Sequence, residues 1–122
     1  MIDFDAPIAM VVTGLLHFLP DHEHPARHLR ALMDACAPGS HLVITQVAAD
    51  LAVAAGRATA AALRQLAIPC QVRDRSEVLG LLGDLEAIEP GLVPMAQWRP
   101  DGPVAKGVLE RQIVYGAVAR KR

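Results

Sequence analysis

The chain has 122 residues, 52% of them hydrophobic and 20% charged, which is enough for one folded domain with a buried core. Its formal net charge of −1 gives no basic surface for nucleic acid, and the closing Arg120-Lys121-Arg122 is too short to make one. The longest apolar run falls far short of a membrane span, and residues 1–20 lack the basic start of a secretory signal. We therefore expect a cytoplasmic protein that binds neither nucleic acid nor membrane.

The first expected element is a strand over residues 8–12, an unbroken apolar run of Ile, Ala, Met, Val and Val. A run that is apolar on both faces is typical of a strand buried inside a parallel sheet. In open α/β sheets, ligands bind just beyond the carboxyl ends of the strands. The stretch from Thr13 to Asp21 is therefore where we look for chemistry.

A helix should follow, with Pro25 in its first turn and an apolar stripe formed by Leu29, Leu32, Met33 and Cys36. Pro38-Gly39 ends it, and residues 42–47 then read as a second buried strand. Strand, helix and strand within about 40 residues make a right-handed crossover unit, so we expect these two strands to lie parallel and adjacent.

The next stretch, residues 50–66, predicts an alanine-rich helix capped by Asp50, with Leu51, Ala55, Ala58, Ala62 and Leu66 on one face. A shorter helix should start at Asp74, because Glu77 stands three residues later in the capping-box position, and it should stop at Gly83.

Two further strands are expected after the helices. Residues 85–89 form a third strand that ends at Pro90-Gly91, residues 95–107 read as a loop, and residues 112–119 form a final strand.

The two cysteines, Cys36 and Cys70, have no paired ligand spacing, so we expect them to be reduced and unpaired. His24 and His28 share a helix face four residues apart, next to Asp21, His22 and Glu23. No third ligand has convincing spacing, and we expect no metal site.

Several short phrases occur in register with this order of elements, and together they resemble a bacterial family of S-adenosyl-L-methionine-dependent methyltransferases of class I. The phrases are Ile2-Asp3-Phe4-Asp5-Ala6-Pro7, Leu15-Leu16-His17-Phe18-Leu19-Pro20-Asp21, Ala37-Pro38-Gly39-Ser40, Glu89-Pro90-Gly91-Leu92-Val93-Pro94, Trp98-Arg99-Pro100 and Tyr115-Gly116. The resemblance covers essentially all of residues 1–122. It implies an α/β fold: the C-terminal half of a Rossmann-like methyltransferase sheet, with three parallel strands, an antiparallel final strand and helices on both faces.

The chain departs from the family at its beginning. Members carry a glycine-rich turn after the first strand and an acidic residue at the end of the second, and these contact the methionine part and the ribose of the cofactor. This sequence has no such turn. We therefore expect residues 1–122 to form a single partial domain that lacks the Gly-rich cofactor-binding N-terminal half and is inactive alone.

The resemblance also implies a site after the first strand. The loop there would contact S-adenosyl-L-methionine through Thr13, Gly14, Leu15, Leu16 and Phe18. His17 would act as general base toward the methyl acceptor; the alternative is that it only hydrogen-bonds the loop. Methyl transfer from a sulfonium depends more on alignment than on acid–base help, so the class does not require such a base.

Three more residues are candidate substrate contacts. Gln46 ends the second strand at the same edge as Thr13 and Gly14, and could equally make an ordinary strand-end hydrogen bond. Trp98 could cover the acceptor pocket or fold onto the sheet edge, and Arg99 could pair with an acidic group of the substrate.

The expected function is methyl transfer to a small molecule, and the alternative is a non-catalytic α/β interaction or regulatory module that binds no cofactor. A nucleotide-binding oxidoreductase domain is disfavoured because the sequence has no GxGxxG. A long apolar strand at an open sheet edge invites pairing, so we also expect a homodimer through residues 7–15.

Overall fold

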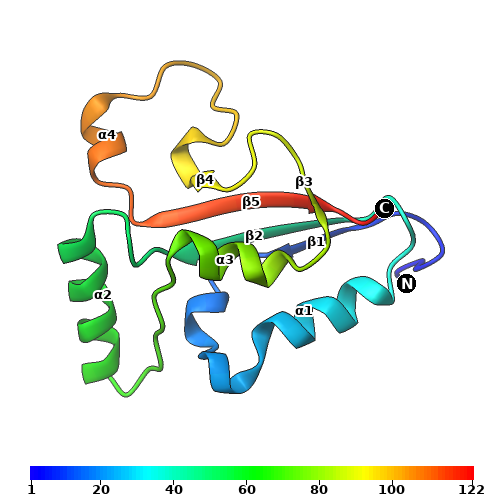
Figure 1. Cartoon of the computed structure of the whole chain (residues 1–122), viewed down its shortest axis with the longest axis horizontal. Coiled ribbons are helices and arrows are strands. Elements are labelled where there is room, and N and C mark those ends of the chain that lie inside the picture. The colour runs from blue at the N-terminus through cyan, green and yellow to red at the C-terminus, as the bar shows by residue number, and fades with distance from the viewer.

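The structure is a computed structural model that describes residues 1–122. One sheet runs through the molecule in the order β1-β2-β5-β3, with β4 also paired to β5 (Figure 1). Its strands are β1 (Ala9–Val12), β2 (His41–Val47), β3 (Glu86–Ala87), β4 (Val93–Pro94) and β5 (Val114–Arg120). The α-helices are α1 (Pro25–Asp34), α2 (Val53–Gln65), α3 (Arg75–Leu82) and α4 (Lys106–Glu110). Three short 3-10 turns complete the fold: η1 (Leu16–Phe18), η2 (Asp21–Glu23) and η3 (Met95–Gln97).

The predicted strand directions are confirmed. β1 lies parallel to β2, with Ala9 opposite His41 and Val12 opposite Ile44. β5 runs antiparallel to β2 on one side and to β3 on the other. The final strand therefore inserts between β2 and β3, and β1, β2 and β3 all point the same way.

β1 is less buried than its composition predicts. It is an edge strand that pairs only with β2, and its residues alternate between exposed and half-buried. Met10 and Val12 pack against the core, whereas the Val11 side chain is 63% exposed. The expectation of burial on both faces was wrong for this strand, because no element covers the face that carries Val11.

The third strand is interrupted and then resumes on the same neighbour. Ala87 lies opposite Ala119, and Val93 lies opposite Gly116. The chain therefore advances six residues from β3 to β4 while β5 advances only three. The Pro90-Gly91 turn predicted to end the strand is therefore a bulge that leaves β5 and returns to it. Beyond it, the expected loop over residues 95–107 contains η3 and the start of α4.

Helical segments lie on both faces of the sheet. The core holds Leu29 and Met33 of α1, Val78 and Leu81 of α3, and the β2 residues that face them. On the opposite face, a Cβ atom added at Gly116 would lie 3.5 Å from the backbone of Met95 in η3. None of the helices is both long and apolar enough to cross a bilayer.

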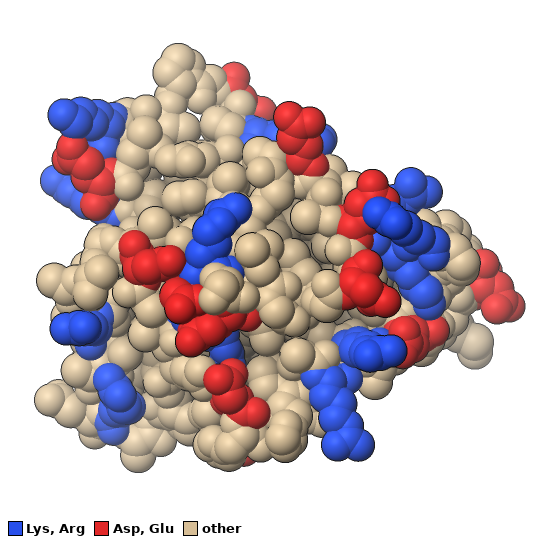
Figure 2. Space-filling model, viewed as in Figure 1, with Lys and Arg blue, Asp and Glu red and all other residues tan.

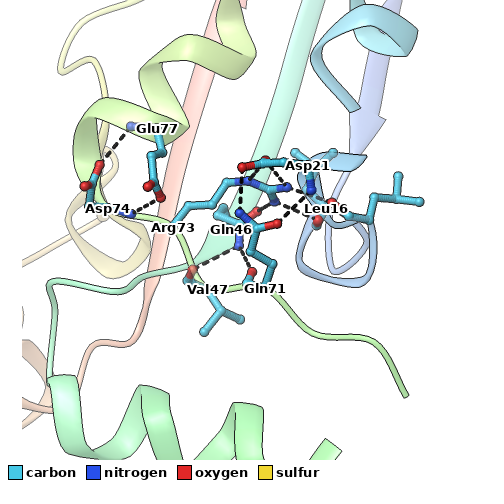
Figure 3. Close-up of polar contacts among 9 residues, drawn as sticks. Leu16, Asp21, Gln46, Val47, Gln71, Arg73, Asp74 and Glu77 are labelled. Atoms are coloured by element: carbon cyan, nitrogen blue, oxygen red, sulfur yellow. Dashed lines mark hydrogen bonds and ion pairs between the residues drawn. The ribbon is translucent and has the colours of Figure 1, made fainter. Parts of the chain in front are cut away.

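The start of α3 confirms the predicted capping box. The Asp74 carboxylate accepts a hydrogen bond from the Glu77 backbone N–H at 2.9 Å, and the Glu77 carboxylate accepts one from the Asp74 N–H at 3.0 Å (Figure 3). Pro25 likewise opens α1 as expected. Of the predicted stripe, Leu29 and Met33 of α1 and Cys36 just beyond its end are buried, but Leu32 is 48% exposed.

The alanine-rich helix differs from expectation. α2 starts at Val53, after Ala52 in a left-handed conformation, and Asp50 does not cap it. Asp50 instead accepts hydrogen bonds from the Arg75 N–H of α3 at 3.0 Å and from the Tyr115 hydroxyl at 2.8 Å. Only Gly56 and Ala60 of α2 are buried, and Figure 1 shows this helix projecting at one end of the sheet.

Gly56 explains which face of α2 is buried. A Cβ atom at this position would lie 3.0 Å from the Ala48 carbonyl oxygen, so the helix approaches the end of β2 at a distance that is tight for any residue with a Cβ atom. The prediction of the buried face was wrong because the helix packs through the close contact of small residues and not through its largest apolar side chains.

Candidate functional site

The carboxyl ends of β1 and β2 meet at one edge of the sheet, as predicted. The Gly14 backbone N–H donates to the Thr45 hydroxyl at 2.9 Å, which joins the two strand ends directly. Gly14 has φ +65°, a conformation that favours glycine, and a Cβ atom there would meet no atom within 4 Å. Thr13, Gly14 and Leu15 are exposed, so this backbone faces open space.

The η1 turn that follows divides its side chains between core and surface. Leu16 is 1% exposed and belongs to the hydrophobic core, so only its backbone remains near the edge. His17 and Phe18 are half-buried, and their ring centroids lie 4.1 Å apart. The turn therefore presents an imidazole and a phenyl ring next to the open stretch of residues 13–15.

The environment of His17 keeps its imidazole neutral. Burial lowers the pKa of His17 from its ordinary value of 6.5, and the positive charge of Arg73 lowers it further. None of the side-chain hydrogen bonds of this loop involves the ring, and the His17 carbonyl oxygen accepts from the Gln71 backbone N–H at 2.8 Å. At neutral pH the ring can accept a proton through a ring nitrogen.

A buried arginine organises the loop that carries His17. Arg73 is 1% exposed, and its guanidinium donates to the Leu16 carbonyl at 2.9 Å and to the Leu19 carbonyl at 2.7 Å. It also donates to one Asp21 carboxylate oxygen, at 3.0 Å from Nη2 and 3.3 Å from Nε (Figure 3). One side chain thus connects both ends of the turn, across more than 50 residues of sequence.

Two glutamines complete this network. Gln46 is fully buried; its amide oxygen accepts from Arg73 at 2.7 Å, and its amide nitrogen donates to the Val47 and Gln71 carbonyls. Gln71 exchanges two hydrogen bonds with Asp21, from its side-chain nitrogen at 2.9 Å and to its side-chain oxygen at 2.7 Å. These bonds lower the pKa of the Asp21 carboxyl, the Gln71 bond more than the Arg73 bond.

Trp98 and Arg99 lie just after β4 and η3 in the chain. Pro94 of β4 pairs with Tyr115 of β5, and Tyr115 pairs on its other side with Gln46, near the carboxyl end of β2. The chain therefore leaves β4 near the carboxyl edge of the sheet, as predicted. η3 then packs on β5, on the sheet face opposite to α1 and α3, whereas η1 packs on β2.

Within this segment the two side chains contact each other. The Arg99 guanidinium stacks 5.0 Å from the centre of the Trp98 ring and donates twice to the Glu89 carbonyl. The indole nitrogen of Trp98 is buried without a hydrogen-bond partner.

The structure therefore brings together the predicted residues of the first loop and Gln46, and Trp98 and Arg99 take no part in that hydrogen-bond network. It also adds Arg73, Gln71 and Asp21, of which only Asp21 stood within the stretch singled out from the sequence. Arg73 gave no local signal, because an arginine one residue before a helix cap is ordinarily solvent-exposed. Only the burial of its side chain shows its role.

Other features of the chain contribute no second site at this edge. Both cysteines are free, Cys36 buried and Cys70 half-buried. No group of three His, Cys, Asp or Glu side chains lies close enough to hold a metal ion. A cavity of about 800 Å³ lies between α1 and α3 at the other end of the sheet, lined in part by Leu42 and Lys121. Figure 2 shows acidic and basic side chains interspersed over the viewed face.

Comparison with known proteins identifies the fold and the family. The family model described as S-adenosyl methyltransferase matches residues 1–122. The chain belongs to this family. No match to the sequence is found among curated proteins.

Two solved structures are closely similar to this S-adenosyl methyltransferase family member. One is a DUF574 family protein from Streptomyces avermitilis MA-4680, with 29% identity and a TM-score of 0.91 over 99% of this chain and 47% of that protein. The other is a candidate methyltransferase from Thermobifida fusca YX, with 35% identity and a TM-score of 0.89 over 100% of this chain and 46% of that one. The pyocyanin biosynthetic protein PhzM shares the fold at 15% identity and a TM-score of 0.59. The chain thus spans about half the length of the Streptomyces and Thermobifida proteins.

The residues at the carboxyl edge fit one wall of a site for S-adenosyl-L-methionine. The exposed backbone at Gly14 has open space beside it, which permits close approach of a ligand. Leu15 and Phe18 offer apolar surface on which the adenine ring could pack. Asp21, the acid within residues 13–21, is engaged by Arg73 and Gln71, so these residues offer no uncommitted carboxylate to ribose hydroxyls.

Proposed function

We propose that this chain serves S-adenosyl-L-methionine-dependent methyl transfer to a small molecule and supplies the wall of the site formed by residues 13–18. The observation that carries the proposal is a neutral, half-buried His17 beside exposed backbone at the carboxyl edge of two parallel strands. Membership of the S-adenosyl methyltransferase family supports the choice of cofactor.

Each residue of this wall has a distinct task in the proposal. Thr13, Gly14 and Leu15 contact the cofactor with their exposed backbone and side chains, and Phe18 packs against it. When bound, S-adenosyl-L-methionine supplies an electrophilic methyl group on sulfur. His17 accepts the proton of the acceptor hydroxyl or amine at a ring nitrogen, which requires the neutral form that its environment favours. Leu16 anchors the loop in the core.

We place the chain as one half of the family fold, a partial domain whose activity requires the remainder. Its sheet and its alignment with less than half of two similar structures support this placement. Trp98 and Arg99 remain candidate substrate contacts, since they follow β4 near the carboxyl edge. Gln46 acts through the network around Arg73, because its side chain is fully buried.

Calorimetric titration of the chain with S-adenosylmethionine and S-adenosylhomocysteine tests the proposal. We expect saturable binding when the remainder of the family fold is supplied as a separate chain, and weaker binding when Leu15, 47% exposed at the edge, is changed to Asp. Leu66→Asp is the matched control, because Leu66 is 71% exposed at the end of α2, away from the site. Equal weakening by both substitutions, or binding untouched by Leu15→Asp, would contradict the assigned wall.

A second candidate function is that of a non-catalytic interaction module. Two observations favour it: the chain matches only about half of the similar proteins, and Asp21 is hydrogen-bonded to Arg73 and Gln71 and so is not free to bind a cofactor. It predicts that neither compound binds even when the remainder of the fold is supplied as a separate chain. Restored binding on mixing the two halves would favour the methyltransferase instead.

We also propose that the chain forms a homodimer through residues 7–15. The Ile8 carbonyl oxygen accepts the His41 N–H, so strand alternation directs the backbone groups of Ala9 and Val11 to the open edge. Light scattering should report a dimer for the chain and a monomer for Val11→Lys, which places a charge on this edge. A monomer for the unmodified chain would contradict the proposal.

A further inference from the structure

Arg73 uses its full hydrogen-bonding capacity inside the protein. A guanidinium has five N–H donors, and the structure shows five donor–acceptor contacts: one to Leu16, one to Leu19, one to Gln46 and two to Asp21. A buried charge is tolerated only when it is paired and hydrogen-bonded, and both conditions hold here. The geometry would not accept lysine, whose single ammonium cannot reach four separate groups in a fixed plane.

The acceptors of Arg73 lie on both sides of His17. The Leu16 carbonyl precedes it by one residue, and the Leu19 carbonyl and Asp21 carboxylate follow it. The backbone of His17 itself is held from the same segment, through the Gln71 N–H. Because the imidazole has no hydrogen bond within the loop, its position is determined by this backbone and by contact with Phe18.

The network also separates His17 from the nearest carboxylate. Asp21 is drawn to Arg73 and Gln71, and therefore does not pair with the imidazole. A carboxylate partner would raise the pKa of His17, whereas the buried cation lowers it. The same side chain thus holds the backbone around His17 and adds to the effect of burial in lowering the pKa of the imidazole.

We propose that Arg73 is the positioning residue of this site: it fixes the turn of residues 16–21 so that His17 faces the carboxyl edge of the sheet. The inference rests on the proposed function in assigning His17 to that edge. Arg73 contacts neither cofactor nor acceptor and acts only through the loop.

Nuclear magnetic resonance of the 122-residue chain provides the test. The variants are Arg73→Lys, which keeps the charge, and Arg73→Met, which removes it; Arg57→Met on the exposed side of α2 is the control. The readouts are the pKa of His17, the hydrogen exchange of the Leu19 and Gln71 amides, and the exchange of amides between β2 and β5. The last readout separates loss of the whole fold from loosening of the loop.

In Arg73→Lys, we expect the Leu19 and Gln71 amides to exchange about tenfold faster or more, because one or two hydrogen bonds to a charged group are lost. The exchange rates of the amides between β2 and β5 should stay the same. In Arg73→Met, we expect the same loosening together with a rise of the His17 pKa toward its ordinary value. Arg57→Met should change neither. If Arg73→Met does not fold, Asp21→Asn provides the second variant, with faster Leu19 and Gln71 exchange.

Loop exchange that stays at its original rate in Arg73→Lys would overturn the inference, and so would acceleration spread equally over β2 and β5. These readouts do not depend on cofactor. Failure to bind S-adenosylmethionine even with the remainder of the fold supplied, together with the expected loop behaviour, would count against the proposed function and not against the role of Arg73.

Discussion

Tyr115 offers a prediction that can be worked through from the structure. Its side chain is 5% exposed at the start of β5, and its hydroxyl donates to the Asp50 carboxylate at 2.8 Å. Burial, followed by the hydrogen bond to Asp50 and its charge, raises the pKa of Tyr115 to about 12. The perturbation we consider is Tyr115→Phe, which removes the hydroxyl and leaves the ring in place.

The effect near pH 8 follows from the loss of one hydrogen bond. Asp50 is exposed and still accepts the Arg75 N–H, so water replaces the phenol and no buried charge is left unpaired. The expected loss in free energy of unfolding is therefore about 1 to 1.5 kcal/mol, which reaches only the lower end of the range for a charged partner.

The pH dependence has a definite sign. Folding raises the pKa of Tyr115 from 10.0 in the unfolded chain, so its contribution is full below pH 10 and is lost as pH rises through about 12. The total loss above both values is about 2 to 3 kcal/mol, and roughly half of it has occurred near pH 11. The stabilities of the original chain and of Tyr115→Phe should thus become equal near pH 11.

Urea unfolding at about pH 8 and about pH 11, followed by circular dichroism, measures this difference. Other groups that titrate in this range are common to both proteins and cancel in the comparison. The chain contains a single tyrosine, so tyrosinate absorbance of the folded protein gives its pKa directly. A stability difference that is the same at both pH values would refute the reasoning, as would a tyrosinate midpoint near 10.

Two further predictions concern packing and helix ends. Gly56→Ala should leave stability unchanged or lower it by about 1 kcal/mol, because the gain in helix propensity is offset by the close contact with the Ala48 carbonyl. Gly80→Ala in α3 meets open space and should raise stability by about 0.5 to 1 kcal/mol. Thermal unfolding measures both variants, and equal gains in stability would contradict the close approach at Gly56. Lys121→Met should lower the free energy of unfolding in urea by about 1 to 2 kcal/mol, because the Lys121 ammonium donates to three carbonyls at the end of α1. Lys106→Met, which removes an exposed ion pair, should change this free energy little. Equal effects of the two substitutions would show that the Lys121 hydrogen bonds contribute nothing.

The sequence alone determined the elements whose signals are local. Pro25 at the start of α1 and the Asp74–Glu77 capping box of α3 act within one helical turn, so their residue types specify the helix starts. The apolar runs of β1 and β2, joined by one amphipathic helix, determined a parallel pair, and with it the edge at which Thr13, Gly14 and His17 lie. The family also followed from the sequence, because its short phrases keep their order along the chain.

The tertiary structure decided what depends on contacts between distant segments. Asp50 is a favoured residue type for a helix cap, yet it does not cap α2, because its carboxylate binds the Arg75 N–H of α3 and the Tyr115 hydroxyl instead. Val11 is as apolar as any core residue, yet it is exposed because no element covers its face of the sheet. Arg73 reads in sequence as a solvated side chain, and only the meeting of the turn after β1, the end of β2 and the segment before α3 supplies acceptors for a buried guanidinium. Burial of a charge depends on such partners, which sequence spacing does not encode.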